Sequence, residues 1–384
     1  MRVVFRRAEL ICLLLTQKSN GVASSERNDA TRFQLAIPTR ECSNATDQVT
    51  AAMVVPIDCL ADWRLDDDDF LAAFKLPGPN ERCDALSKKN PMARENRILF
   101  YEASHTYTVD AIPAPRSVTG LVHAYQASNF DPMLAIEAMK RGKNWPVKME
   151  EFIGEDGSCM SDEEICNVWQ HRGRVASARG TLLHFHAECH LNGMDVEKPH
   201  SPEFRNFLLV AKALAEMGWR PYRTEVCLTH MGLCVCGQLD ALFQNEKGEL
   251  CILDWKNCKN VQFENPFRTL KEPLQHLADC NGNLYALQLN AYRPARYDIH
   301  RLCRSFQFKH PARYILESEY SYVVGGNLYL GVVHKCLPAP RLIRVPYMQE
   351  EMLMIAEDQI RQGKAVSFAI PGPHASFVLP NNGS

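Results

Sequence analysis

The sequence contains no pair of cysteines in a C-x-x-C arrangement, although 15 of its 384 residues are cysteine. The number of cysteines is odd, their spacing is irregular, and several lie inside apolar runs, among them Cys227, Cys234, Cys236 and Cys251. Such thiols are typical of reduced, buried cysteines rather than of a disulfide framework, so we expect an intracellular, reducing compartment. Because zinc and iron–sulfur sites usually use paired cysteines, we expect no iron–sulfur cluster and keep a zinc site as the alternative.

Long apolar runs and an excess of positive charge are also lacking. No run of about eighteen apolar residues occurs, so the sequence predicts no membrane-spanning helix. The formal net charge is -2, whereas a protein that coats DNA by charge alone would be strongly basic. An enzyme that acts on nucleic acid can still be nearly neutral, because acidic metal ligands and a local basic groove cancel in the sum. Nothing in the sequence indicates the oligomeric state.

The N-terminal part lacks sustained hydrophobic periodicity. Its first residues combine arginines with an apolar stretch that Glu9 interrupts. A secretory signal, a mitochondrial presequence and an unstructured start are the three interpretations; the many thiols argue against the first, and Glu9 is unusual in the second. The acidic run from Asp66 to Asp69 is typical of a solvated face or a linker. We therefore predict a poorly structured extension over residues 1–95.

From residue 96 the pattern becomes periodic, which predicts one domain over residues 96–365 and a tail over 366–384. Strand-like alternation and helical spacing follow one another, and several helices begin with a capping residue. We expect helices over 117–125, 132–140, 161–170, 176–193, 202–219, 283–293 and 349–361, and strands over 98–110 (a hairpin), 223–230, 233–244, 249–256, 327–335 and 341–347. This order predicts an α/β fold in which helices flank a central mixed β-sheet.

The strongest chemical signal lies in the segment GQLDALFQNEKGELCILDWK. Asp240 is on one strand and Asp254 on the next, and a meander can bring the two to the same end of adjacent strands. Asp254 and Lys256 are two residues apart, so both side chains point to one face. Two carboxylates supply the hard oxygen ligands that Mg²⁺ and Mn²⁺ prefer. A neighbouring lysine can hold the attacking water and offset the charge that develops during phosphodiester hydrolysis.

A D-x-K sequence alone is common, and it usually marks a solvated strand edge or an ion pair. The apolar run around Asp254 favours the catalytic interpretation, because a buried carboxylate needs a partner or a metal.

Two helical motifs accompany the strands. In G-x-x-x-H-x-x-x-E, which begins at Gly180, His184 and Glu188 lie four residues apart on one helix face. His184 is therefore a candidate third metal ligand. In Q-x-x-x-Y, Gln288 and Tyr292 share a face, where an amide and a phenol can hold a phosphate or orient the lysine. The alternatives are a histidine with ordinary structural partners and an ordinary helix surface.

The order of these motifs resembles the RecB-type branch of the PD-(D/E)XK nuclease superfamily, in which a G-x-x-D strand, here Gly237 to Asp240, follows the histidine motif. That branch includes the nuclease domains of RecB and AddB and the mitochondrial genome maintenance exonucleases. The matched core runs from about Val168 to Tyr292. The resemblance implies a restriction-endonuclease-like core and Mg²⁺- or Mn²⁺-dependent hydrolysis of phosphodiester bonds in DNA, by an exonuclease that acts on single-stranded ends.

The resemblance also implies individual roles. His184, Asp240 and Asp254 would bind the metal together with the carbonyl group of Trp255, and Lys256 would be the catalytic lysine. The residues that would support the catalytic site or the DNA are Glu188, Gln288 and Tyr292, with Glu225 on the preceding strand as a weaker candidate.

The sequence departs from the family pattern at three places. Leu239 replaces the proline of the family name. The C-terminal cysteine cluster of AddB-type members is missing, which is a further reason to expect no iron–sulfur cluster. Residues 294–313 interrupt an apparently continuous helical pattern with basic and aromatic residues, so they are either a DNA-contacting loop or an insertion outside the core, and the continuity favours the insertion. A catalytically inactive module that binds nucleic acid, and an endonuclease or RNase of the same fold, are the alternative functions.

Overall fold

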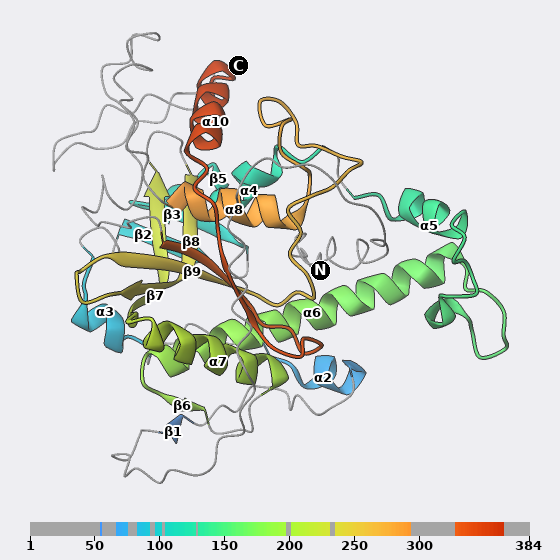
Figure 1. The fold of residues 1–384 in the computed structure, drawn as a ribbon, viewed down its shortest axis with the longest axis horizontal. Coiled ribbons are helices and arrows are strands. Elements are labelled where there is room, and N and C mark those ends of the chain that lie inside the picture. Colours follow the sequence, from blue (N-terminus) through green and yellow to red (C-terminus); the bar gives the residue numbers. More distant parts are fainter. Residues whose placement is uncertain are drawn as a thin grey trace.

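The computed structural model describes residues 54–55, 67–75, 83–92, 97–101, 104–127, 130–196, 201–230, 235–292 and 327–364. Within these ranges the chain forms a mixed α/β structure around a six-stranded sheet (Figure 1). The strands of this sheet are β5 (Arg116–Ser117), β7 (Arg220–His230), β8 (Val235–Gln244), β9 (Leu250–Lys256), β10 (Asn327–Val332) and β11 (Arg341–Arg344).

Five of the six strands follow the order β11-β10-β9-β8-β5, and the sixth, β7, pairs with β8. The pairs β9–β10 and β5–β8 are parallel, while β7–β8, β8–β9 and β10–β11 are antiparallel. The sheet is therefore mixed, as the sequence predicts. Beside it, β2 (Ile98–Tyr101), β3 (Thr106–Val109) and β4 (Ile112–Pro113) form a three-stranded antiparallel sheet that includes the predicted hairpin.

Helices pack on both faces of the main sheet. One face carries α4 (Val118–His123), α8 (Asn281–Tyr292) and α10 (Gln349–Arg361), whose apolar side chains join those of the strands in one large core cluster, here called the α8 core. The other face carries α6 (Asp162–Leu191) and α7 (Pro202–Glu216), which form a second cluster, here called the α6–α7 core. The sheet is thus the middle layer between two groups of helices, as expected for strands that are apolar on both sides.

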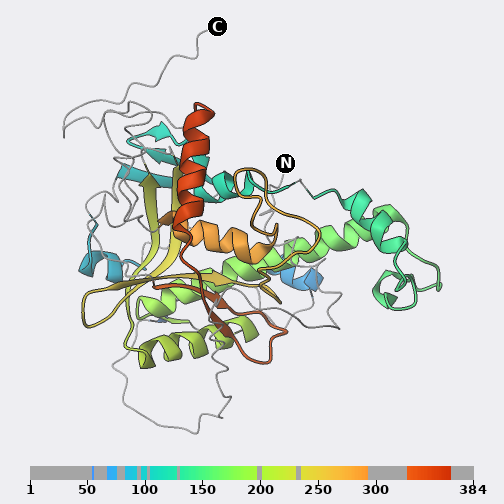
Figure 2. The same cartoon turned by 45° about the horizontal axis from the view of Figure 1, so that its top comes forward.

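Helix α6 is 30 residues long and continuous, whereas the sequence predicts two helices over 161–170 and 176–193. Ser161 caps it through the predicted capping box with Glu164. The intervening residues 171–175 contain no proline, so nothing in the backbone chemistry ends the helix there. The first half of α6 extends away from the sheet together with α5 (Pro132–Lys140) and the short 3-10 helix η2 (Glu150–Phe152), as Figures 1 and 2 show.

The N-terminal part contains more structure than predicted for residues 1–95. Helix α2 (Asp67–Ala73) begins in the acidic run, where negative charge favours a helix N-terminus. Its Phe70 is fully buried and packs against Ala178 and Leu182 of α6. A further helix, α3 (Ala85–Lys89), follows, and the two-residue strands β1 (Val54–Val55) and β6 (Asp195–Val196) pair with each other.

Three predictions fall on residues outside the described ranges: the form of residues 1–53, the segment 294–313 and the tail over 366–384. Among the residues described, no helix is both long and apolar enough to cross a membrane.

Candidate metal centre

The side-chain pattern of strand β8 reverses at Asp240. Side chains two residues apart on a strand normally lie on the same face. However, Leu239 packs in the α8 core and Ala241 packs in the α6–α7 core, although both are fully buried and only one residue separates them. The ribbon therefore twists sharply at Asp240, which takes this side chain out of the regular alternation.

The paired strand β7 reverses at the same level. Val226 packs in the α8 core, whereas the hydroxyl group of Thr224 accepts a hydrogen bond from Asn192, the residue that ends α6. Between them, Glu225 has a φ of 47°, which lies in the left-handed region that non-glycine residues rarely adopt. Such backbone strain concentrates at functional sites, where the surrounding structure holds it in place. Here the strained backbone conformation belongs to Glu225, whose carboxylate lies beside Asp240.

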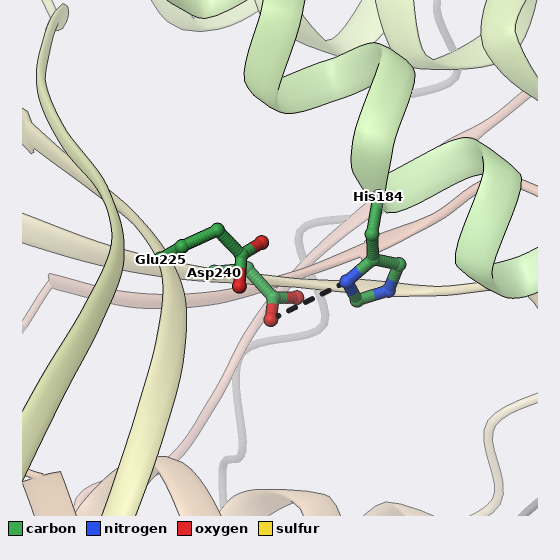
Figure 3. Close-up of side chains that lie close together, drawn as sticks. All are labelled: His184, Glu225 and Asp240. Carbon is green, nitrogen blue, oxygen red and sulfur yellow. Dashed lines mark ion pairs between the residues drawn. The ribbon is translucent and has the colours of Figure 1, made fainter. Parts of the chain in front are cut away.

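Glu225 and Asp240 lie level with each other and face His184 of α6. The pairs Thr224–Ala241 and Val226–Leu239 fix the register. Figure 3 shows the two carboxylates extending from the strands toward the imidazole. One ligand atom from each residue lies within 4.8 Å of the others, and Nδ1 of His184 is 3.5 Å from Oδ1 of Asp240. In the part of the chain that the structure describes, this is the one group of three such side chains with this spacing.

A buried ion pair lies next to this group. Nζ of Lys256 is 2.6 Å from Oδ2 of Asp254, and the Asp254 side chain is only 4% exposed. Apart from Lys256, this oxygen has no hydrogen-bond partner among the described residues. The pair thus confirms that Asp254 and Lys256 share a face. Of the two ordinary alternatives for D-x-K, burial excludes the solvated strand edge, whereas the ion pair is what these two side chains form.

Burial raises the pKa of Asp254 from 3.8 to about 6, the nearby Lys256 ammonium opposes this rise, and the negative charge of Asp240 adds to it. The His184 imidazole also acts on Asp254 electrostatically. The two predicted carboxylates therefore lie within reach of each other's charge, and His184 interacts electrostatically with both.

The residue between Asp254 and Lys256 fixes Asp240. The backbone N–H of Trp255 donates a 2.7 Å hydrogen bond to Oδ2 of Asp240, so Oδ1 is the oxygen that faces His184. The indole of Trp255 is buried and packs edge-on against Phe207 of α7, with 4.8 Å between ring centroids. The predicted role of the Trp255 carbonyl as a ligand stays a prediction.

Helix α8 supports the strands from the opposite face. The hydroxyl of Tyr292 donates a 3.2 Å hydrogen bond to the carbonyl of Gln238, and a side-chain hydrogen bond joins it to Gln288. A Cβ atom at Gly237 would lie 2.4 Å from the Tyr292 hydroxyl oxygen. The glycine of G-x-x-D is therefore required by the tyrosine of Q-x-x-x-Y, and Gly237 and Tyr292 brace the strand that carries Asp240.

Two residues, Glu225 and Tyr285, are stronger site candidates in the structure than in the sequence. Glu225 was the weakest sequence candidate, yet it completes the group with His184 and Asp240, whereas Glu188 does not belong to that group. Tyr285 was missed: its ring centroid is 4.5 Å from Nζ of Lys256. Its sequence signal was the spacing of three to Gln288 and seven to Tyr292, which puts an aromatic side chain on the same helix face.

The donor set fits a divalent cation. One imidazole and two carboxylates converge, and a third carboxylate is buried beside them with its charge only partly offset. Carboxylate oxygens with a single imidazole suit Mg²⁺ or Mn²⁺. No family model and no curated protein matches this chain.

Proposed function

We propose that the protein is a nuclease of the RecB-type PD-(D/E)XK branch, with a restriction-endonuclease-like core, which uses Mg²⁺ or Mn²⁺ to hydrolyse phosphodiester bonds in DNA. One observation carries this proposal: the group His184, Glu225 and Asp240 lies beside the buried pair of Asp254 and Lys256. The order of the four motifs supports it, since the structure gathers parts of all four around strands β8 and β9.

The residues divide the work between binding and proton chemistry. The group of three, together with Asp254, would hold the metal, which supplies charge stabilisation at a phosphoryl oxygen and a more acidic water. Asp240 keeps its orientation because Trp255 fixes one of its oxygens. Lys256 remains 18% exposed, so its ammonium can donate a hydrogen bond to a water or to a phosphate oxygen where negative charge develops.

The proposed substrate is DNA with a free single-stranded end, a choice that rests on the resemblance. The decisive experiment uses the purified full chain with Mg²⁺ or Mn²⁺ on end-labelled linear single strands, duplexes, closed circles and RNA. We expect metal-dependent cleavage of linear single-stranded DNA that is lost in Lys256→Ala. Lys259→Ala, at an exposed lysine just beyond the strand, is the matched control and should cleave normally.

Cleavage that persists in Lys256→Ala would contradict the assignment of the lysine. Equal rates on closed circles and linear strands would contradict the preference for ends, and a stronger cleavage of RNA would change the substrate class.

A further inference from the structure

The ammonium group of Lys256 contacts both a carboxylate and an aromatic ring. Oδ2 of Asp254 is 2.6 Å from Nζ. The ring centroid of Tyr285 is 4.5 Å from the same atom. Tyr285 is only 5% exposed, so the ring is held in the packed α8 core rather than free to rotate into solvent.

Tyr285 extends a stripe on α8 that already serves the site. It lies three residues before Gln288 and seven before Tyr292, so the three side chains follow one face of the helix. Tyr292 contacts the strand that carries Asp240, through the carbonyl of Gln238. Tyr285 contacts the strand that carries Asp254, through Lys256. The one helix thus braces both strands of the catalytic pair, through two tyrosines that lie two turns apart.

A lysine needs such a contact more than most side chains do. Its four-carbon stem is flexible and its ammonium is a compact charge without directional preference. A single ion pair does not fix the direction from which an ammonium group approaches a carboxylate. The negative face of an aromatic ring attracts a cation, and more strongly where water is excluded, so the ring restricts Lys256 to one side of Asp254.

We propose that Tyr285 is a positioning residue of the nuclease reaction, whose ring holds the Lys256 ammonium against Asp254 and toward the reacting phosphate. This inference rests on the proposed function, because it concerns the lysine that the proposed reaction uses. Tyr285 belongs to none of the four sequence motifs, and it acts through Lys256 rather than on the substrate.

Three variants of the full chain test this role. Tyr285→Phe keeps the ring, Tyr285→Leu removes it and keeps an apolar side chain, and Tyr285→Met fills the space with a flexible chain if the leucine variant does not fold. Tyr329→Leu is the control, since this half-buried tyrosine of β10 packs in the α6–α7 core on the other face of the sheet. The measurements are kcat and KM on a linear single-stranded substrate with Mn²⁺, Mn²⁺ affinity, and thermal unfolding.

We expect Tyr285→Leu and Tyr285→Met to lower kcat by roughly five- to thirtyfold, the range of a desolvated cation–aromatic contact, with KM and Mn²⁺ affinity unchanged. Tyr285→Phe should retain most of kcat, and Tyr329→Leu should lower the unfolding temperature without lowering kcat.

Two results would overturn the inference while the proposed function stands: an unchanged kcat in the variants without the ring, or an equal loss in Tyr285→Phe and Tyr285→Leu. If the unsubstituted chain cleaves no nucleic acid with either metal, the proposed function fails, and the role of Tyr285 fails with it.

Discussion

Replacing Gly237 by alanine should damage the site through Tyr292. The added Cβ would lie 2.4 Å from the tyrosine hydroxyl oxygen, 2.7 Å from Cε1 and 3.0 Å from Cζ. Tyr292 cannot move away cheaply, because it is 1% exposed and its hydroxyl donates to the carbonyl of Gln238. Either the helix shifts from the strand or the ring is displaced, and both changes disturb the strand that carries Asp240.

The magnitude follows from two contributions. Forcing one methyl group into a well-packed core costs about 1–3 kcal/mol. Loss of the hydrogen bond from Tyr292 to Gln238 adds about 1 kcal/mol. We therefore expect Gly237→Ala to lower the free energy of unfolding by about 2–4 kcal/mol. In a Tyr292→Leu background the three clashing atoms are gone, so the same substitution should cost close to nothing.

Urea unfolding of the two single variants and the double variant measures this coupling. Gly331→Ala is the matched control, because its Cβ would lie 2.6 Å from the ring of Trp255 instead. Tyr292→Leu should not relieve that clash. If the costs of Gly237→Ala and Tyr292→Leu simply add, within about 0.5 kcal/mol, the close approach of α8 to β8 does not explain the glycine, and the reasoning is wrong.

Three further predictions concern the N-terminal helix, the buried carboxyl and the strained ligand. Phe70→Ala should lower the free energy of unfolding by about 3–5 kcal/mol, measured by urea unfolding, because its ring is fully buried against α6; a loss below about 1 kcal/mol would show that α2 is dispensable. Burial raises the pKa of Asp254 to about 6, so the metal-free fold favours the protonated carboxyl and loses stability as the pH rises through that value. Relative to Asp254→Asn, the unsubstituted protein should therefore lose about 2 kcal/mol of unfolding free energy from about pH 4 to about pH 7, and a difference independent of pH contradicts this. Glu225→Gly should stabilise the metal-free fold by about 0.5–1 kcal/mol, because glycine accepts the positive φ, and should weaken Mn²⁺ binding about tenfold or more; calorimetry that finds tight binding in this variant would remove Glu225 from the ligand set.

The regular elements could be predicted because their signals are local. The helix over Gln349–Arg361 and the strands β7, β8 and β9 follow from hydrophobic periodicity and turn residues. The continuity of α6 could not be read in the same way, because residues 171–175 are mostly polar and include Gly173, which interrupts the apolar period although Gly173 and Val175 are buried. Phe70 was hidden for another reason: only Phe70, Leu71 and Phe74 follow the acidic run at helical spacing, and about one turn of apolar residues is too short to establish a period.

The site shows the same difference between residues placed by local geometry and residues placed by tertiary packing. Asp254 and Lys256 are two residues apart on one strand, so their shared face is fixed by local geometry. Glu225 joins His184 and Asp240 only because two paired strands reverse their faces at one level, and a reversal of this kind is a tertiary feature. The contact of Tyr285 with Lys256 likewise depends on how α8 packs across β9, which no spacing within the helix determines.

The most direct test of the metal-dependent nuclease compares Asp240→Asn with the unsubstituted chain on end-labelled linear single-stranded DNA across a series of Mn²⁺ concentrations. Asparagine keeps an oxygen that can accept the hydrogen bond from Trp255 and removes only the charge. Asp156→Asn, on an exposed loop beside α5 and η2, controls for the loss of one carboxylate. We expect cleavage by the unsubstituted chain and by Asp156→Asn only when Mn²⁺ is present, and no cleavage by Asp240→Asn at any concentration. Cleavage by Asp240→Asn at the unsubstituted rate and the same Mn²⁺ concentration would contradict the proposed function.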